Sequence, residues 1–253
     1  MNRSIIKSKL FRRILVVIFW LFVWEIASRI IHQDILLASP AQVAKTLAEY
    51  LFQADFWQTI FYSFIRILVG FGSAVLLGIC LAVLASTSEW IQTLLHLPMT
   101  IIKSTPVASF IIIVLLWFGS KWLSSIISFL MVLPVIYSNT LQGILQTDQK
   151  LLEMAQVFRI PLKRKVKAIY LYDVMPYFVS SLTISLGLAW KSGVAAEVIG
   201  LPSGSIGEKL YQAKIFLSSA DLIAWTITII LISFLFERVV LKLVQNLQQK
   251  LES

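Results

Sequence analysis

Six strongly apolar stretches are separated by short polar segments along the chain, and their lengths predict membrane-spanning helices. An α-helix needs about 20 apolar residues to cross the ~30 Å hydrocarbon core of a bilayer. We assign the spans to residues 14–31, 57–86, 90–118, 122–145, 176–199 and 222–243. Pro98 and Pro106 interrupt the third stretch, which we interpret as one tilted, kinked helix because membrane helices tolerate proline. The pattern predicts an all-α, polytopic membrane protein whose residues 1–253 form a single transmembrane domain.

The polar segments between the spans contain short amphipathic helices. Ser39 followed by Pro40 is a typical helix start, and an apolar stripe follows it. A second short helix is predicted around residues 206–216, after a segment rich in Gly, Pro and Ser. We expect both helices on the outer side of the membrane.

The longest polar interruption, residues 146–172, is strongly basic and lies between the fourth and fifth spans. Apolar residues recur at helical spacing through its first half. That helix should end near Arg159, because Ile160 precedes a proline, and Pro161 is suited to begin a second helix. Two short helices joined by a corner would form a docking platform, although a solvated basic loop fits the same pattern.

The distribution of basic residues predicts the orientation in a bacterial inner membrane. The chain has 22 Lys and Arg residues and a net charge of +9. Most of these residues precede the first span, follow the sixth, or lie in residues 146–172. The opposite side has only Lys45, Lys121, Lys209 and Lys214. The positive-inside rule therefore predicts that both termini and residues 146–172 are cytosolic. Because the basic residues lie beside apolar spans, lipid headgroups explain the charge better than nucleic acid does.

The composition also excludes several kinds of chemistry. The single cysteine, Cys80, allows no intramolecular disulfide, and no Cys or His cluster predicts a metal site. The sequence lacks a GxxxxGK[ST] phosphate loop, and no polar segment is long enough to form a nucleotide-binding domain. We therefore expect no enzyme activity and no bound cofactor in this chain, and any ATP-driven work must come from a separate chain.

Two spans carry stripes of small residues at a spacing of four, which places each stripe on one helix face. The residues are Gly70, Ala74 and Gly78 in the second span, and Ser185, Ala189 and Gly193 in the fifth. Small residues let neighbouring helix backbones approach closely in a membrane. We expect both stripes to mediate helix packing, within the bundle or at a subunit interface.

Three charged residues within the spans are candidates for a translocation path. They are Lys103, Lys191 and Glu197. Charge inside a membrane is costly, so it generally faces a partner or a water-filled cavity. Lys103 either lines a cavity or lies at the inner interface. Lys191 and Glu197 either act in transport or form structural ion pairs with other spans.

The basic segment resembles the "EAA" loop of ABC importer permeases. That family has Glu-Ala-Ala, a glycine four residues after the last alanine, and Ile-x-Leu-Pro farther on. This chain keeps Glu153 and Ala155, with Arg159 at the glycine position and Tyr172 at the proline position. The segments LASP, SFIRILVGF, IIIVLLWFG, AWKSGVAAEVIG and SGSIGEKLYQAKIF are similar to nitrate/sulfonate/taurine-type permeases, and they extend over nearly the whole chain.

The resemblance implies the fold and partners of a type I importer. Two permeases, commonly identical, would sit on two ATPases that bind ATP and Mg, and an extracytoplasmic binding protein would deliver the substrate. ATP binding would tip the bundle from inward-facing to outward-facing. The ATPase-coupling residues would be Glu153, Ala155, Phe158, Arg159, Pro161 and Arg164.

The resemblance also limits the substrate without fixing it. It implies a small anionic or polar solute of the nitrate, sulfonate or taurine kind, and a pyrimidine-like vitamin precursor fits the same mechanism. Two other classes remain as alternatives: a secondary transporter that uses Lys191, Glu197 or Arg66 as ion-coupled groups, and a scaffold subunit that only recruits a partner.

Overall fold

The protein folds entirely into helices over the part of the chain that the structure describes. This computed structural model describes the backbone of residues 2–252 and the side chains of residues 11, 12 and 14–246. Five basic residues that contribute to the predicted orientation have side chains outside this set. They are Arg3, Lys7, Lys9, Arg13 and Lys250.

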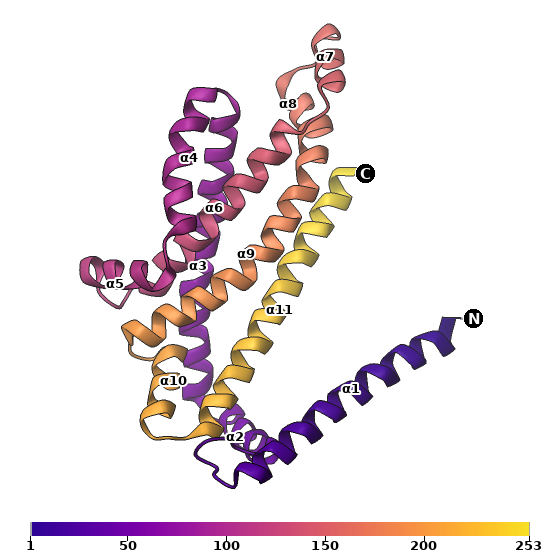
Figure 1. Ribbon diagram of the computed structural model, residues 1–253. Coiled ribbons are helices and arrows are strands. Elements are labelled where there is room, and N and C mark those ends of the chain that lie inside the picture. Colours follow the sequence, from indigo (N-terminus) through magenta and orange to yellow (C-terminus); the bar gives the residue numbers. More distant parts are fainter. Residues whose placement is uncertain (1, 253) are drawn as a thin grey trace.

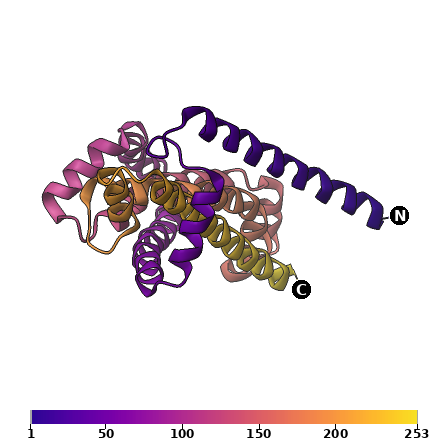
Figure 2. The ribbon, with the colours of Figure 1, turned by 90° about the horizontal axis from the view of Figure 1, so that it is seen from below.

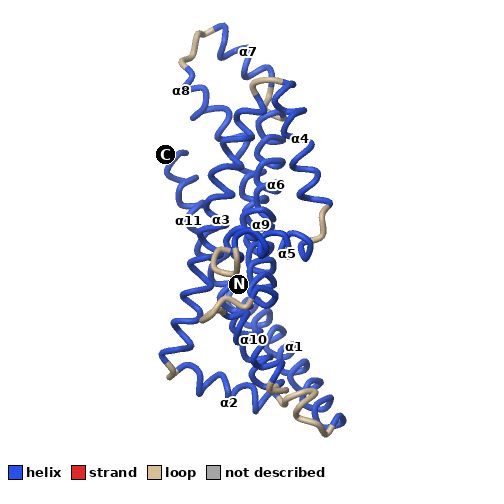
Figure 3. The backbone as a smooth tube through the Cα atoms, turned by 90° about the vertical axis from the view of Figure 1, so that its left-hand side faces the viewer, coloured by secondary structure: helices blue, strands red, loops and turns tan. Residues whose placement is uncertain are grey.

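Figure 1 shows the helices as an elongated, tilted bundle. In chain order they are α1 (Asn2–Ile31), α2 (Pro40–Leu51), α3 (Ala54–Ser86), α4 (Glu89–Ser104), α5 (Val107–Phe118), α6 (Leu123–Leu145), α7 (Gln149–Val157), α8 (Leu162–Lys165), the π-helix η1 (Val166–Tyr170), α9 (Leu171–Gly200), α10 (Ile206–Ile215) and α11 (Ser219–Glu252). Helices α7 and α8 lie at one end of the molecule and α2 at the other, as Figure 3 also shows. We call these the α7–α8 end and the α2–α10 end.

Helices α3, α6 and α9 form the centre of the molecule, and α6 packs against both of the others. All six residues of the two small-residue stripes are buried there. A Cβ atom at Gly70 would lie 2.2 Å from the Ser125 carbonyl oxygen, so α3 and α6 are in backbone contact. On the other side of α6, Ser128 Oγ donates a hydrogen bond of 3.0 Å to the Ala189 carbonyl of α9. The stripes therefore lie where the three backbones approach most closely.

Residues 90–118 do not form the single kinked helix predicted for the third span. Helices α4 and α5 are bent by 102° relative to each other. The break occurs at Thr105, which is extended because a residue before proline is disfavoured in the helical region, and Pro106 has no N–H to continue the helix. Pro98, in contrast, lies inside α4. At ~24 Å and ~18 Å, neither helix alone crosses the hydrocarbon core.

Among the described residues, four helical segments are long and apolar enough to cross a membrane, and the bent α4–α5 pair raises the number to five. Helix α11 covers the stretch predicted as the sixth span. The fifth span was predicted to open at Pro176, but α9 begins at Leu171 and Pro176 lies inside it. The reason is that α8, η1 and α9 follow one another without a break, and one missing hydrogen bond does not end so long a helix. Six spans stay a prediction.

Helix α1 extends away from the other helices (Figures 1 and 2). The side-chain hydrogen bonds described between α1 and the segment that follows it lie near its C-terminal end, where Trp24 Nε1 and Ser28 Oγ donate to the carbonyls of Ala38 and Leu37, each at 3.0 Å. Most of its apolar side chains are exposed in the single chain, Trp20 by 63%. This face is therefore left for lipid or for another protein chain to cover.

Candidate functional site

The first candidate site is a polar cavity of about 340 Å³ between α4 and α6. Lys103 lies in the last turn of α4, and its Nζ donates a hydrogen bond of 2.7 Å to Ser138 Oγ of α6. The Ser138 hydroxyl in turn donates to the Pro134 carbonyl one turn earlier. The cavity lining consists of Gln92, His96, Met99, Thr100, Lys103, Tyr137, Ser138, Leu141, Gln142, Leu145 and Gln146.

The charge in this cavity comes from a single basic side chain among the described residues of the lining. Tyr137 is 5% exposed, and its hydroxyl has no hydrogen-bond partner among the described residues. Lys103 supplies a positive charge, and none of the described residues that line the cavity carries a carboxylate. Ammonium and hydroxyl groups bind anions through charge-assisted hydrogen bonds. The cavity therefore fits a small anion better than a cation.

The second candidate site is the loop at the α7–α8 end, whose corner has a defined geometry. Asp148 caps α7 by accepting a 2.8 Å hydrogen bond from the Lys150 backbone N–H. After α7, Arg159 adopts a left-handed conformation with φ of +50°. The N–H groups of Ile160 and Arg159 bond back to the carbonyls of Ala155 (2.9 Å) and Gln156 (3.0 Å). This is a Schellman motif, which commonly uses glycine at the position that Arg159 occupies.

The outward face of this loop combines apolar and basic side chains. Phe158 is 73% exposed and Leu162 is also 73% exposed, beside the exposed Arg159 and Arg164. Glu153 and Pro161 are exposed as well, whereas Ala155 is buried at 2%. Five of the six predicted coupling residues are thus accessible to a partner. The sixth, Ala155, supports the corner through its carbonyl.

Comparison with known proteins decides the family. Residues 74–253 match the family described as binding-protein-dependent transport system inner membrane component. The chain belongs to this family. It is therefore the multi-pass inner membrane permease component of an ABC importer.

Several permeases of known name are similar to this chain over most of their length. The putative aliphatic sulfonates transport permease of Escherichia coli (strain K12) is 30% identical over 201 residues, which cover 78% of this chain and 75% of that protein. The taurine transport system permease of the same organism is 25% identical over 220 residues, which cover 85% of this chain and 80% of that protein. The formylaminopyrimidine transport permease of Halalkalibacterium halodurans is 25% identical over 183 residues, which cover 72% of this chain and 73% of that protein.

The other two charged residues predicted for the path lie away from the Lys103 cavity of the permease. Glu197 is fully buried between α3, α9 and α10. Its Oε2 accepts hydrogen bonds from Ser63 Oγ (2.8 Å) and from the Gly207 N–H (3.3 Å). Ser63 Oγ also accepts from the Ile206 N–H at 2.9 Å, so the N-terminus of α10 is tied to α3 and α9. This geometry favours a structural role for Glu197, through hydroxyl and amide groups rather than an ion pair.

Lys191 is exposed on α9, and neither it nor Glu197 lines the Lys103 cavity. Arg66, the remaining charged candidate, places its guanidinium 3.9 Å from the centre of the Tyr62 ring. The structure therefore does not bring Lys103, Lys191 and Glu197 together. The role of Lys191 in transport stays a prediction.

Sequence reasoning missed the residues that complete the Lys103 cavity. Tyr137 and Ser138 lie in the middle of the fourth predicted span, within the polar run Tyr-Ser-Asn-Thr. A polar run inside an apolar helix is the signal that would have pointed to a cavity there. His96 gave no such signal, because its place beside α6 depends on the break at Pro106.

Proposed function

We propose that this permease moves a small anionic solute from an extracytoplasmic binding protein into the cytosol, and that the anion passes Lys103. The observation that carries this proposal is the acid-free cavity around the Lys103 ammonium. Among the hydroxyls of the lining, those of Ser138 and Thr100 donate to the carbonyls of Pro134 and His96, which leaves the Tyr137 hydroxyl as the further donor without a partner among the described residues. Relatives named for aliphatic sulfonates and taurine support a substrate with an anionic group.

Substrate uptake by lysine variants tests this proposal. The complete transporter, with its ATPase and binding protein, is placed in proteoliposomes and supplied with labelled taurine, an aliphatic sulfonate, nitrate and a neutral pyrimidine. A charge-assisted hydrogen bond contributes about 1.5–3 kcal/mol, which corresponds to about 10–150-fold. We expect Lys103→Gln to lower anion uptake by at least about 10-fold, and Lys103→Arg to retain more of it.

Lys121→Gln is the matched control, because Lys121 is another exposed lysine and lies outside the cavity. Its uptake should stay within about twofold of the unmodified permease. Anion uptake at full rate by Lys103→Gln would overturn the assignment of the path. Transport of the neutral pyrimidine alone would overturn the proposal that the substrate is an anion.

We infer that α7 and its corner dock on the ATPase, which holds ATP and Mg, while this chain binds neither. The exposed Glu153, Phe158, Arg159, Pro161 and Arg164 would form the contact. Phe158 would supply buried apolar area, and the charged side chains would set the register of docking. The unbroken run of α8, η1 and α9 links this surface to the helix that packs on α6, so a displacement of the loop would be transmitted to the bundle.

We infer further that two copies of the permease form the membrane part of the importer, with both termini cytosolic. The support is the apolar face of α1, which the single chain leaves exposed. Disulfide trapping between cysteines introduced along α1 tests the pairing. A second copy predicts crosslinked dimers at some positions, whereas a lipid-covered α1 predicts none.

A further inference from the structure

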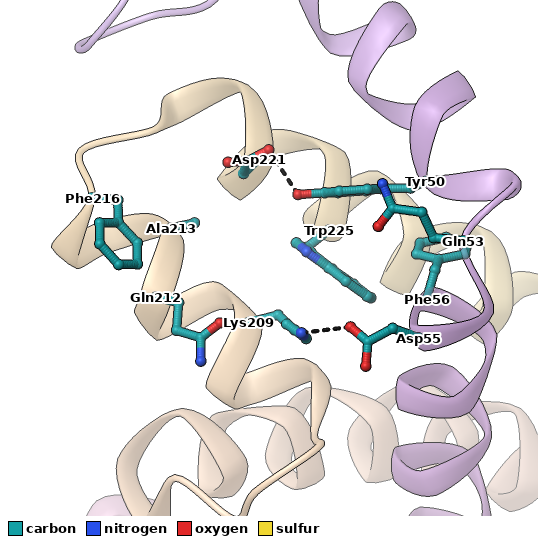
Figure 4. A pocket seen from close by; sticks show the side chains of 10 residues that line it. All are labelled: Tyr50, Gln53, Asp55, Phe56, Lys209, Gln212, Ala213, Phe216, Asp221 and Trp225. Carbon is teal, nitrogen blue, oxygen red and sulfur yellow. Dashed lines mark hydrogen bonds and ion pairs between the residues drawn. The ribbon is translucent and has the colours of Figure 1, made fainter.

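A second polar cavity, of about 160 Å³, lies at the α2–α10 end, far from the coupling loop (Figures 1 and 4). It is bounded by the C-terminal end of α2, the first turn of α3, α10, and the first turns of α11. Small-molecule sites usually measure about 300–1,000 Å³. This cavity is therefore on the scale of one protruding side chain rather than of a whole ligand.

One wall of the cavity is aromatic. The ring centroids of Tyr50, Phe56 and Trp225 lie between 5.1 and 5.7 Å from one another. Phe56 and Trp225 are nearly fully buried, which fixes the wall in place. Clustered aromatic faces attract cations through their quadrupoles.

Two carboxylates lie in the same lining, as Figure 4 shows. Asp221 accepts a hydrogen bond of 2.7 Å from the Tyr50 hydroxyl. Burial, together with the negative charge of Asp221, raises the pKa of the Tyr50 phenol, so this hydroxyl remains a donor. Asp55 accepts from Lys209 Nζ, also at 2.7 Å, and its side chain is 65% exposed. With one lysine against two aspartates, the lining has a net negative charge.

The rim of the cavity is apolar and exposed. Phe216 lines the cavity and is 79% exposed, and its neighbours Ile215 and Leu217 are 57% and 62% exposed. A long basic side chain places its aliphatic stem on apolar surface and its charged head on a carboxylate. The apolar rim and the two carboxylates of the lining together match a side chain of this shape.

We propose that this cavity is a docking socket for one lysine or arginine side chain of the extracytoplasmic binding protein. The inference rests on the proposed function, which makes the α2–α10 end the face that the binding protein meets. The incoming cation lies against the aromatic wall, bonds to Asp55, and displaces Lys209 from it. The hydrogen bond from the Tyr50 hydroxyl to Asp221 holds Tyr50 in the aromatic wall.

Affinity of the binding protein for the assembled transporter tests the socket. The complete transporter is held in lipid nanodiscs, and the Kd of the purified, fluorescently labelled binding protein is measured at low and high salt. Asp55→Asn should weaken binding by about 10-fold or more, because it removes the negative charge that pairs with the cation. Lys209→Gln should tighten binding by several-fold, because it removes the competing cation. The two variants therefore shift the Kd in opposite directions.

If the Lys209–Asp55 ion pair were purely structural, the result would differ. Loss of either partner would then change the Kd in the same direction. Glu49→Gln is the matched control for charge, because Glu49 is exposed in α2 but does not line the cavity. The Kd of the binding protein for this variant should stay within about twofold of the Kd for the unmodified transporter. Thermal midpoints of all variants verify folding, and Phe216→Ala probes the rim without altering charge. It should weaken binding by a few-fold.

The outcomes separate this inference from the proposed function. Failure of the unmodified transporter to bind the binding protein would refute the proposed partner itself. Normal binding with equal Kd values for Asp55→Asn and Lys209→Gln would overturn the socket alone. Millimolar arginine should compete for the socket and weaken binding of the binding protein to the unmodified transporter, and unchanged binding in arginine would count against the socket.

Discussion

Two glycines in one helix provide the sharpest test of how the bundle is packed. Gly70 and Gly72 both lie in α3, so replacing either with alanine gains the same helix propensity, about 1 kcal/mol. A Cβ atom at Gly72 would meet nothing within 4 Å. A Cβ atom at Gly70 would lie 2.2 Å from the Ser125 carbonyl oxygen of α6 and 2.9 Å from its carbonyl carbon.

The difference between the two variants isolates the cost of the clash, because the propensity term cancels. The contact at Gly70 is with backbone, which cannot turn aside as a flexible side chain can. Separating the helices would also stretch the 2.8 Å hydrogen bond from Ser125 Oγ to the Arg66 carbonyl. Overpacking of this kind costs about 1–3 kcal/mol, so Gly70→Ala should unfold roughly 2–12 °C below Gly72→Ala.

Thermal unfolding of the two variants in detergent, followed by tryptophan fluorescence, measures this difference. Gly72→Ala should melt at or above the temperature of the unmodified permease, and Gly70→Ala below it. Equal midpoints would refute the close approach of α3 and α6. A lower midpoint for Gly72→Ala alone would show that a second chain, rather than α6, covers this helix most closely.

Three further predictions concern the coupling loop and Glu197. Arg159→Gly should keep the corner, with Ile160 amide exchange equal to or slower than in the unmodified permease. Arg159→Val should speed that exchange, because a β-branched residue is strained at positive φ. Glu153→Lys should insert normally but abolish uptake, and uptake at the unmodified rate would contradict the docking assignment. Glu197→Ala should destabilise the permease by about 2–4 kcal/mol in thermal unfolding, since it leaves Ser63 and the Gly207 N–H without an acceptor. Glu197→Gln should keep uptake, and a folded but inactive Gln variant would indicate a role in the path.

Much of the fold could be predicted because hydrophobic length and local helix signals are visible in the sequence. The capped start of α2 at Ser39 and Pro40 is an example, since both partners of the capping box lie within four residues. The small-residue stripes were equally readable, because a spacing of four depends only on helix geometry. What these signals could not give was the partner of each stripe. The stripe of α3 packs on α6, whereas the stripe of α9 meets α6 and, at Gly193, also Ile67 of α3.

The sequence was misleading where prolines in similar apolar stretches had opposite effects. Pro98 and Pro176 lie inside helices, but Pro106 ends one. The difference depends on whether neighbouring helices compensate the lost hydrogen bond, which is a tertiary property. The corner at Arg159 was uncertain for a related reason. The left-handed conformation there is imposed by the two hydrogen bonds of the Schellman motif, despite a residue that does not favour it.

The break at Pro106 also bears on the role proposed for Lys103. Because α4 ends at Ser104, the Lys103 ammonium lies in its last turn, where unpaired carbonyls and the helix dipole stabilise positive charge. In one continuous helix through residue 118, those carbonyls would be bonded internally and this stabilisation would be lost. The bend also turns α5 by 102° away from the direction of α4, so α4 alone faces Tyr137 and Ser138 across the cavity. The proposed anion path past Lys103 therefore depends on the proline that separates α4 from α5.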